Sequence, residues 1–371
     1  MKFLKEFSRY FVGLVFIFSG FVKGVDPLGT TYKIEDYFIA YGMDWAIPLS
    51  LYLAVILVSV EFLLGIALFF RLRMKISSIL ILLMMIFFTI LTFFDALFNP
   101  VPDCGCFGDA ITLTNWETFY KNIVLMVFVL IIFRSRTKYK KRLSFFLQNS
   151  ILIVFSIAFI FFSIYNYKHL PIIDFMDWKV GKDMVPDNQG EEKIYLTYAN
   201  KNTSEEKEYL SPNYPWKDSV WMSQWEFKSQ RIDDSEVLRS HELAIENEFG
   251  EDVTDNFIPN PDLQFLFIAY DLSKTNKKAF EKIASFAKNA DYDGYSFIVL
   301  TSDIPELVEQ FKYDMNLDME FYNSDDIVLK TMVRSNPGLM LLKNGVVLDK
   351  WHYNDLPEYS EIINFYGNIE N

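Results

Sequence analysis

The loop Pro102-Asp103-Cys104-Gly105-Cys106-Phe107-Gly108-Asp109 holds both cysteines of this 371-residue chain and lies between two long hydrophobic segments. Hydrophobic residues make up 51% of the sequence. They gather in its first half, in runs long enough to cross a bilayer. Two cysteines this close together can bond to each other, to a partner protein or to a metal. The segments on either side of the loop indicate which of these three bonds the cysteines can form.

Five apolar segments predict five membrane-spanning helices. Their approximate ranges are 10–22, 48–70, 75–94, 120–133 and 143–164. The first has the basic start of a secretory signal, but no small-x-small cleavage site precedes Lys23 and further spans follow, so we expect a retained helix. Residues 23–47 mix charged and aromatic side chains, which predicts a loop and an amphipathic segment at the membrane surface.

Charge divides the chain into two halves. Residues 1–168 hold 16 Lys/Arg against 10 Asp/Glu, whereas residues 169–371 hold 19 against 38. Phosphates would be repelled by the acidic half, which argues against nucleic acid as a partner. Basic clusters occur at the N-terminus, at 71–75 and at 134–142. Short basic loops stay in the cytoplasm, so the N-terminus is predicted to be cytoplasmic, and the cysteine loop and the C-terminal half periplasmic, in a bacterial inner membrane.

The C-terminal half has the pattern of an α/β domain. Continuous apolar runs at 264–270 and 295–300 predict buried strands, and 337–342 with 345–351 predict an antiparallel pair. Helices are expected at 276–287, near 304–311 and at 357–365. Residues 249–254 indicate a turn within a hairpin. In residues 166–250, Trp216, Trp221 and Trp225 indicate local packing without evident chemistry.

This order of strands and helices resembles the thioredoxin fold over about residues 243–370. Ser335-Asn336-Pro337-Gly338 stands where that family carries a cis-proline. Thioredoxins carry Cys-x-x-Cys after the first core strand, but Asp271-Leu272-Ser273-Lys274-Thr275-Asn276 holds no cysteine. The resemblance therefore implies a binding or structural module on a redox fold, since fold alone does not confer activity.

The membrane half resembles another family. Gly13-Leu14-Val15-Phe16-Ile17-Phe18-Ser19-Gly20-Phe21-Val22-Lys23, then Glu61 followed by Gly65, and the Asp-Cys-Gly-Cys-Phe-Gly loop are similar to the DoxX-type membrane proteins. The nearest branch is MauE, of methylamine utilisation, over about residues 5–135. That resemblance implies a four-helix bundle and a part in disulfide formation during maturation of an exported enzyme.

Cys104 and Cys106 are the leading candidate site residues. A Cys-x-Cys bridge closes a small, strained ring, which Gly105 makes more feasible because it tolerates positive φ. Strained, exposed disulfides are the labile and catalytic ones, whereas the acidic neighbours Asp103 and Asp109 disfavour a thiolate. The alternative is a structural staple of the loop.

A metal site is the weaker alternative for the two thiols. Zinc and copper sites need further soft or imidazole ligands. The chain's histidines, His169, His241 and His352, all lie in the soluble half.

Glu61 is the third candidate, because an ionisable residue within a span usually faces a bundle interior or a functional cavity. It could accept protons or contact a quinone headgroup, or it could be a neutral, hydrogen-bonded acid with no obvious partner in the sequence. Lys23 and Asp26 are predicted to anchor the interface or to pair with each other, with a lesser chance of lining the cysteine site. Asp95 is predicted to be a boundary residue.

These observations predict a four-helix DoxX-like α-helical transmembrane bundle (1–142), a fifth transmembrane helix (143–167), a connecting region (168–242) and an α/β thioredoxin-like periplasmic domain (243–371). The leading hypothesis is a membrane-bound thiol–disulfide redox protein that acts on exported client proteins, with Cys104, Cys106 and Glu61 as its catalytic residues and quinone as a possible acceptor in the lipid bilayer. The alternatives are a non-catalytic scaffold or assembly factor with a partner-binding domain, and a small-molecule or lipid carrier.

Overall fold

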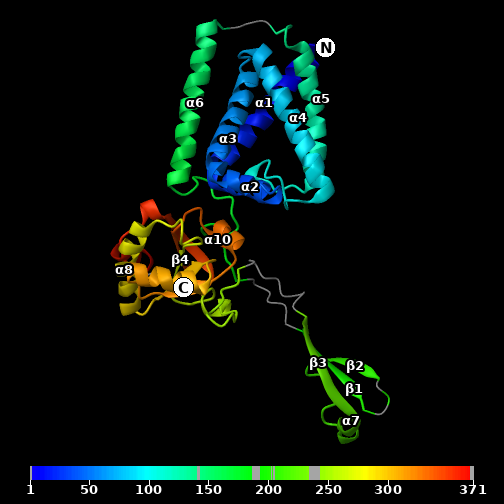
Figure 1. Ribbon diagram of the computed structural model, residues 1–371, viewed down its shortest axis with the longest axis vertical. Helices are drawn as coiled ribbons and strands as arrows, with labels where there is room; N and C mark the ends of the chain where they lie inside the picture. Colours follow the sequence, from blue (N-terminus) through cyan, green and yellow to red (C-terminus); the bar gives the residue numbers. More distant parts are fainter. Residues whose placement is uncertain are drawn as a thin grey trace.

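The computed structural model describes residues 2–139, 143–185, 193–201, 203, 205–233 and 243–367. A helical bundle forms one end of the molecule, and the five-stranded α/β domain lies below it (Figure 1). One helix, α2 (Pro27–Ala40), runs across the base of the bundle, between the other helices and the α/β domain.

Five helices in the described chain are long and apolar enough to cross a membrane, as the sequence predicts. They are α1 (Lys2–Val25), α3 (Ser50–Phe69), α4 (Met74–Phe98), α5 (Asn115–Ser135) and α6 (Phe145–Lys168). Helix α5 begins earlier than predicted because Thr114 and Glu117 form a capping box that satisfies its first amide groups.

Residues 23–47 are more regular than predicted, since α1 continues to Val25 and α2 follows at once. Asp26 caps α2 by accepting a hydrogen bond from the Gly29 amide at 2.8 Å, and Pro27 occupies the first turn, where its missing N–H costs nothing. A short 3-10 helix, η1 (Asp44–Leu49), leads into α3.

Helices α1 and α3 approach closely, which builds the site described below. A Cβ atom at Gly65 would lie 2.6 Å from the backbone nitrogen of Ile17, so only glycine allows this separation. The close approach places Ser19 and Lys23 of α1 opposite Glu61 of α3. Helix α6 packs on the outside of α3, where the rings of Phe159 and Phe62 stack with centroids 4.3 Å apart.

The predicted basic clusters meet at one end of the bundle. Glu6 pairs with both Arg9 and Arg71, and the Tyr139 hydroxyl donates to the Lys5 carbonyl. The cysteine loop lies at the opposite end, next to α2 and the α/β domain (Figure 1).

The α/β domain is built on a sheet of order β6-β5-β4-β7-β8. Strand β4 pairs in parallel with β5 and antiparallel with β7, and every residue of β4 is buried. The two faces of β4 pack into separate hydrophobic cores. Phe265 and Phe267 lie in the core on the side of α8, and Leu266 and Ile268 lie in the core on the other side of the sheet. The strands are β4 (Gln264–Ile268), β5 (Ser296–Thr301), β6 (Glu320–Asn323), β7 (Gly338–Lys343) and β8 (Val346–His352), and the helices α8 (Lys277–Tyr292), α9 (Pro305–Met315), α10 (Asp326–Met332) and α11 (Tyr359–Tyr366).

The predicted strands and helices of this domain are confirmed, but two elements were missed. Strand β6 is too short, and α10 too brief, for their periodicity to be evident in the sequence. The predicted turn at 249–254 is present, and an antiparallel bridge between Glu246 and Asp252 flanks it in place of two extended strands. The Asn336–Pro337 peptide bond is cis, as its position predicts.

The region predicted as a connection contains a small antiparallel sheet of order β2-β1-β3. Its elements are β1 (Lys193–Asn200), β2 (Glu206–Leu210), α7 (Ser219–Gln224) and β3 (Trp225–Asp233). The predicted packing of tryptophans holds for Trp221 and Trp225, whose rings stack, whereas Trp216 is largely exposed.

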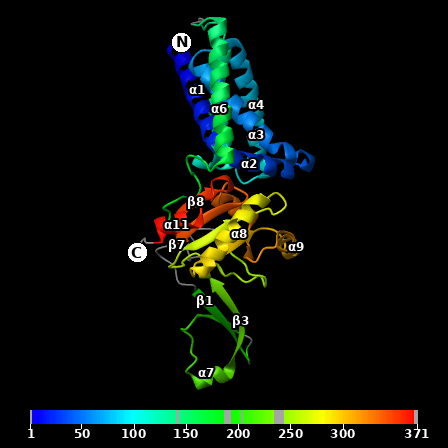
Figure 2. The same ribbon diagram turned by 90° about the vertical axis from the view of Figure 1, so that its left-hand side faces the viewer.

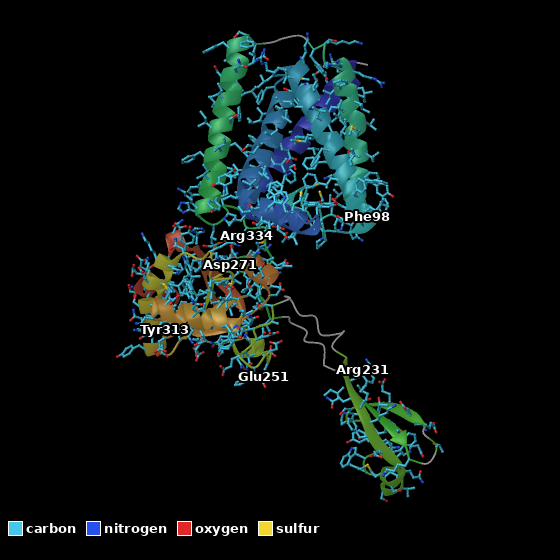
Figure 3. All side chains as sticks on the ribbon, in the orientation of Figure 1. Phe98, Arg231, Glu251, Asp271, Tyr313 and Arg334 are labelled. Atoms are coloured by element: carbon cyan, nitrogen blue, oxygen red, sulfur yellow. The ribbon has the colours of Figure 1, made fainter. Side chains whose placement is uncertain are left out.

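The α/β domain lies against the base of the bundle (Figure 2), and Arg334, in the loop before its cis-proline, makes contacts there. Arg334, which Figure 3 labels at this junction, donates from Nε to Asp26 at 2.7 Å and from Nη2 to Asp109 at 2.8 Å. The hydroxyls of Tyr32 on α2 and Tyr270 lie 2.7 Å apart. The docking therefore joins the cysteine loop and α2 to the soluble domain.

Candidate functional site

The cysteine loop holds its two thiols next to each other. Both cysteines are free and half-buried, and their Sγ atoms are 3.2 Å apart. Gly105 has φ +61, a left-handed conformation that reverses the chain between the two side chains. The Gly105 amide donates to Asp103 Oδ1 at 2.8 Å, which fixes this turn. The loop therefore presents a vicinal dithiol with little freedom to separate.

The acidic neighbours do not oppose a thiolate as predicted, because each is paired with a cation. Asp103 accepts from Lys33 of α2 at 2.7 Å, and Asp109 accepts from Arg334. Burial nevertheless raises the pKa of Asp109, with Arg334 acting in the opposite direction. The prediction erred because it weighed sequence neighbours, whereas side chains from α2 and the α/β domain decide the local charge.

The surroundings of the two thiols shift their pKa values in opposite directions. A hydrogen bond from Cys104, aided by the ammonium groups of Lys121 and Lys23, lowers the pKa of Cys106 to about 6 against the opposing effect of burial. The same hydrogen bond and burial raise the pKa of Cys104. Cys106 is therefore the thiolate of the pair near neutral pH, and Cys104 holds the proton.

Glu61 has partners that the sequence does not reveal. It forms a salt bridge with Lys23, and both side chains are almost completely buried. The Ser19 hydroxyl lies 2.7 Å from Glu61 Oε1 and 2.6 Å from the carbonyl oxygen of Cys106. Lys23 thus pairs with Glu61 and not with Asp26, and Ser19 connects the intramembrane ion pair to the cysteine loop.

Asp95 is more than the boundary residue that its position predicts. Its side chain is fully buried at the end of α4, and its Oδ2 accepts a 2.7 Å hydrogen bond from the Tyr37 hydroxyl. Tyr37 and Cys104 both line the cavity described below, and the Tyr37 hydroxyl acts to lower the pKa of the Cys104 thiol against burial and the bond to Cys106. Burial, together with the charges of Cys104 and Asp95, raises the pKa of Tyr37. Tyr37 therefore connects Asp95, by a hydrogen bond, with the surroundings of Cys104.

A cavity of about 590 Å³ lies beside the two cysteines, within the bundle. Its polar end is formed by Ser19, Lys23, Glu61, Lys121 and the thiol loop. The wall that α3 and α4 contribute is apolar apart from Glu61 and includes Leu53, Ile56, Leu57, Val60, Met84, Phe87, Phe88 and Leu91. Two of these side chains, Ile56 and Phe87, are each more than half exposed.

All three predicted site residues, Cys104, Cys106 and Glu61, line this one cavity. Sequence reasoning missed Ser19, Tyr37 and Lys121. Ser19 and Lys121 had a weak signal, as polar residues at the ends of apolar spans, whereas Tyr37 was one aromatic residue among several in α2. Only the packing of the helices distinguishes it.

Among the described residues, no three His, Cys, Asp or Glu side chains are arranged to hold a metal ion. His169 pairs with Asp355, with Nδ1 2.8 Å from Oδ1, where α6 meets the α/β domain, and it is distant in the sequence from the two cysteines. His241 lies outside the described residues.

Residues 1–135 match the family model described as methylamine utilisation protein MauE. The first 135 residues are therefore similar to MauE. The match ends at the last residue of α5, so it contains α1 to α5 and the cysteine loop, which line the cavity, but excludes α6 and the α/β domain. No curated protein and no solved structure matches the chain.

Proposed function

We propose that this MauE-like protein is a membrane-bound thiol–disulfide oxidoreductase, in which Cys104 and Cys106 oxidise thiols of exported client proteins and pass the electrons to a quinone of the bilayer. One observation carries the proposal: two adjacent free thiols lie at the polar end of an apolar cavity inside a membrane bundle. A structural staple of the loop would need no such cavity.

The chemistry has two half-reactions. A client thiolate attacks the Cys104–Cys106 disulfide and forms a mixed disulfide with Cys104, while Cys106 leaves as a thiolate. A second client thiolate then attacks the client sulfur, which releases the oxidised client and the reduced pair. In the other half-reaction, the thiolate–thiol pair would give two electrons to a quinone as the Cys104–Cys106 bond forms again, and the quinone would become a quinol by taking up two protons, the one that Cys104 releases and one from water.

The cavity suits a quinone in size and in polarity. Pockets of 300–1,000 Å³ with an apolar wall and a few convergent polar groups hold small organic ligands, and the cavity of about 590 Å³ falls within this range. Lys23 and Lys121 line the cavity beside Cys106 and would supply hydrogen-bond donors to a quinone headgroup. The apolar side chains from α3 and α4, among them the exposed Ile56 and Phe87, would contact its apolar tail.

The positive-inside pattern supports a periplasmic position for the thiol loop and the α/β domain. The parallel pair β4–β5, the antiparallel pair β7–β8 and the cis-proline before β7 support a thioredoxin-like fold for this domain. Without cysteines, the domain recruits or positions the client, and its docking beside Asp109 places a bound client close to the dithiol.

The first test is thiol trapping in intact cells. Cells are treated with a maleimide reagent with and without a block of the respiratory chain, and the mass shift of the protein reports the redox state of Cys104 and Cys106. We expect a largely oxidised pair that becomes reduced when electron flow stops. A pair that stays oxidised in both states would support the scaffold alternative, with the disulfide as a staple.

A second test uses the purified protein in nanodiscs. The reduced protein should convert one equivalent of a short-chain ubiquinone to quinol as its thiols disappear, and the Cys104→Ser variant should convert none. If Glu61→Gln abolishes function in cells while both cysteine variants retain it, the carrier alternative is correct.

A further inference from the structure

We propose that Tyr37 and Asp95 form a built-in proton relay, in which the Tyr37 hydroxyl carries the proton of Cys104 to and from the buried Asp95 carboxylate during dithiol–disulfide exchange. This inference rests on the proposed dithiol chemistry and assigns the proton path on which it depends. Tyr37 touches the reacting sulfur and is a catalytic residue, whereas Asp95 acts through Tyr37 and is a positioning residue and proton acceptor.

The geometry of three groups carries the proposal. The Tyr37 hydroxyl donates to Asp95 Oδ2 at 2.7 Å, and the same side chain lines the cavity together with Cys104, where its hydroxyl acts to lower the pKa of the thiol. A tyrosine hydroxyl both donates and accepts, which allows it to take a proton on one side while it releases its own on the other. The transfer needs no movement of the backbone.

A second observation concerns the other carboxylate oxygen. Asp95 has no exposed surface, and its Oδ1 has no hydrogen-bond partner among the described residues. A buried carboxylate oxygen without a partner is costly, and protonation removes part of that cost. A purely structural acid would have both oxygens satisfied, whereas Asp95 has an oxygen available for the arriving proton.

The charges around the dithiol explain why Cys104, and not Cys106, needs such a relay. Cys106 faces Lys121 and Lys23, which stabilise its thiolate directly. Cys104 retains its proton, and it must lose it before its sulfur can attack. The titratable groups that face Cys104 are Cys106, Tyr37 and Lys121, and those that face Asp95 are Tyr37 and Tyr41.

The protons and electrons balance at each step. When the disulfide forms, the Cys104 proton moves to Tyr37 as the Tyr37 proton moves to Asp95, and the Cys104 sulfur bonds to Cys106 Sγ. The two electrons pass to the oxidant, which is the quinone in the proposed function; in the test below it is a disulfide reagent joined to Cys106, whose thiolate is expelled. When a client thiolate later displaces Cys104 from a mixed disulfide, the same proton returns from Asp95 to Cys104.

The test uses the reduced, purified full-length protein and the small apolar disulfide 4,4′-dithiodipyridine. Cys106 attacks the reagent and releases a first pyridinethione, and Cys104 then closes the ring and releases a second. Stopped-flow absorbance separates the two phases. Since a general base contributes about 10²- to 10⁴-fold, we expect Tyr37→Phe and Asp95→Asn to slow the second phase by at least ~10-fold and to leave the first within ~2-fold.

The pH profile adds a readout that loss of packing would not change. In the wild-type protein the second phase should be fast near neutral pH, and in both variants it should rise only at higher pH, where Cys104 ionises unaided. Asp95→Glu should restore part of the rate. The matched controls Tyr120→Phe, at an exposed position of α5, and Asp36→Asn, on α2, should behave as the wild-type protein does.

Infrared difference spectroscopy follows Asp95 itself. The oxidised-minus-reduced spectrum should gain a carboxylic acid C=O band that Asp95→Asn lacks. Equal second-phase rates and pH profiles in all variants would overturn the relay but leave the dithiol function standing. A wild-type protein that releases no second pyridinethione would overturn both, because its cysteines would not form a disulfide.

Discussion

Arg334 offers the sharpest test of how the soluble domain is held on the membrane bundle. Its guanidinium is 6% exposed and bonds with two carboxylates from the other domain, Asp26, which is 9% exposed, and Asp109, which is 33% exposed. The substitution Arg334→Met keeps much of the apolar stem but leaves Asp26 buried and without its cation. Among the described residues, the Gly29 amide is then the one hydrogen-bond donor that the Asp26 side-chain oxygens retain.

The free energy of docking that Arg334→Met should lose follows from how deeply the ion pairs of Arg334 with Asp26 and Asp109 are buried. Removal of one partner from a buried ion pair costs about 3–5 kcal/mol, and the pair with Asp109 adds little because a third of that side chain meets solvent. We therefore expect docking to weaken by about 3 kcal/mol, which is roughly a 100-fold shift toward the undocked state. Arg334→Lys should lose less, since an ammonium keeps the charge but not the fork that spans both carboxylates.

Hydrogen exchange of the full chain in nanodiscs measures this shift. Peptides from 27–33 and 330–336 should exchange faster in Arg334→Met, while β4 should remain protected because the domain itself stays folded. Lys33→Met is the matched control, since it breaks the pair with Asp103 within the membrane domain, where both side chains are 28% exposed. If exchange at 27–33 is unchanged in Arg334→Met, this ion-pair cluster does not hold the domains together.

Three further predictions concern the thiols, the intramembrane ion pair and a histidine of the soluble domain. The rate of Cys106 alkylation in the reduced protein, followed by mass spectrometry across a pH series, should titrate with a pKa of about 6. Cys104→Ala should raise this pKa because the thiol that donates to the Cys106 thiolate is gone. An unchanged profile would contradict the stabilisation of the Cys106 thiolate by Cys104. Lys23→Met and Glu61→Gln should each lower the free energy of unfolding by about 3 kcal/mol, as measured by thermal unfolding. The double variant should lose much less than the sum of the two, since it leaves no unpaired charge in the bundle. Additive losses of unfolding free energy would show that the two residues do not interact. Burial lowers the pKa of His352 from 6.5 to about 4, so the unfolded chain takes up a proton before the folded one does as the pH falls. The neutral, buried His352 therefore contributes to the free energy of unfolding in full above pH 6.5. Up to about 3 kcal/mol of that free energy is lost as the pH falls to 4. His352→Asn should reduce that acid sensitivity, and equal pH slopes for the two proteins would refute the assignment.

The local features of the fold could be predicted from the sequence because they depend on neighbours along the chain. The five spans follow from uninterrupted apolar runs, and β4 and β5 follow from short apolar runs between turn residues. Gly105 between two cysteines indicated a tight reversal, and its φ of +61 agrees. Errors arose where local signals were weak, as at the brief β6 and α10, and at α2, where charged and aromatic residues concealed a helix.

The candidate site shows a sharper division between what was predictable and what was not. The sequence identifies Cys104, Cys106 and Glu61 as unusual because thiols and intramembrane acids are rare. It does not identify their partners, since Glu61 pairs with a lysine 38 residues away and Tyr37 with an aspartate 58 residues away. Reasoning from neighbours along the chain therefore found no partner for Glu61 and expected Asp103 and Asp109 to disfavour a thiolate. Both expectations failed because residues distant in the sequence decide these contacts.

The sequence by itself determined which segments cross the membrane, where the dithiol lies in the chain and that the soluble domain has no cysteines. Hydrophobic length and residue identity are properties of each segment alone. Only the tertiary structure decided that Asp95 meets Tyr37 and that Arg334 reaches Asp26 across 308 residues. Such pairs depend on how closely helices such as α1 and α3 approach and on how one domain docks on another, and no single stretch of the chain encodes those distances.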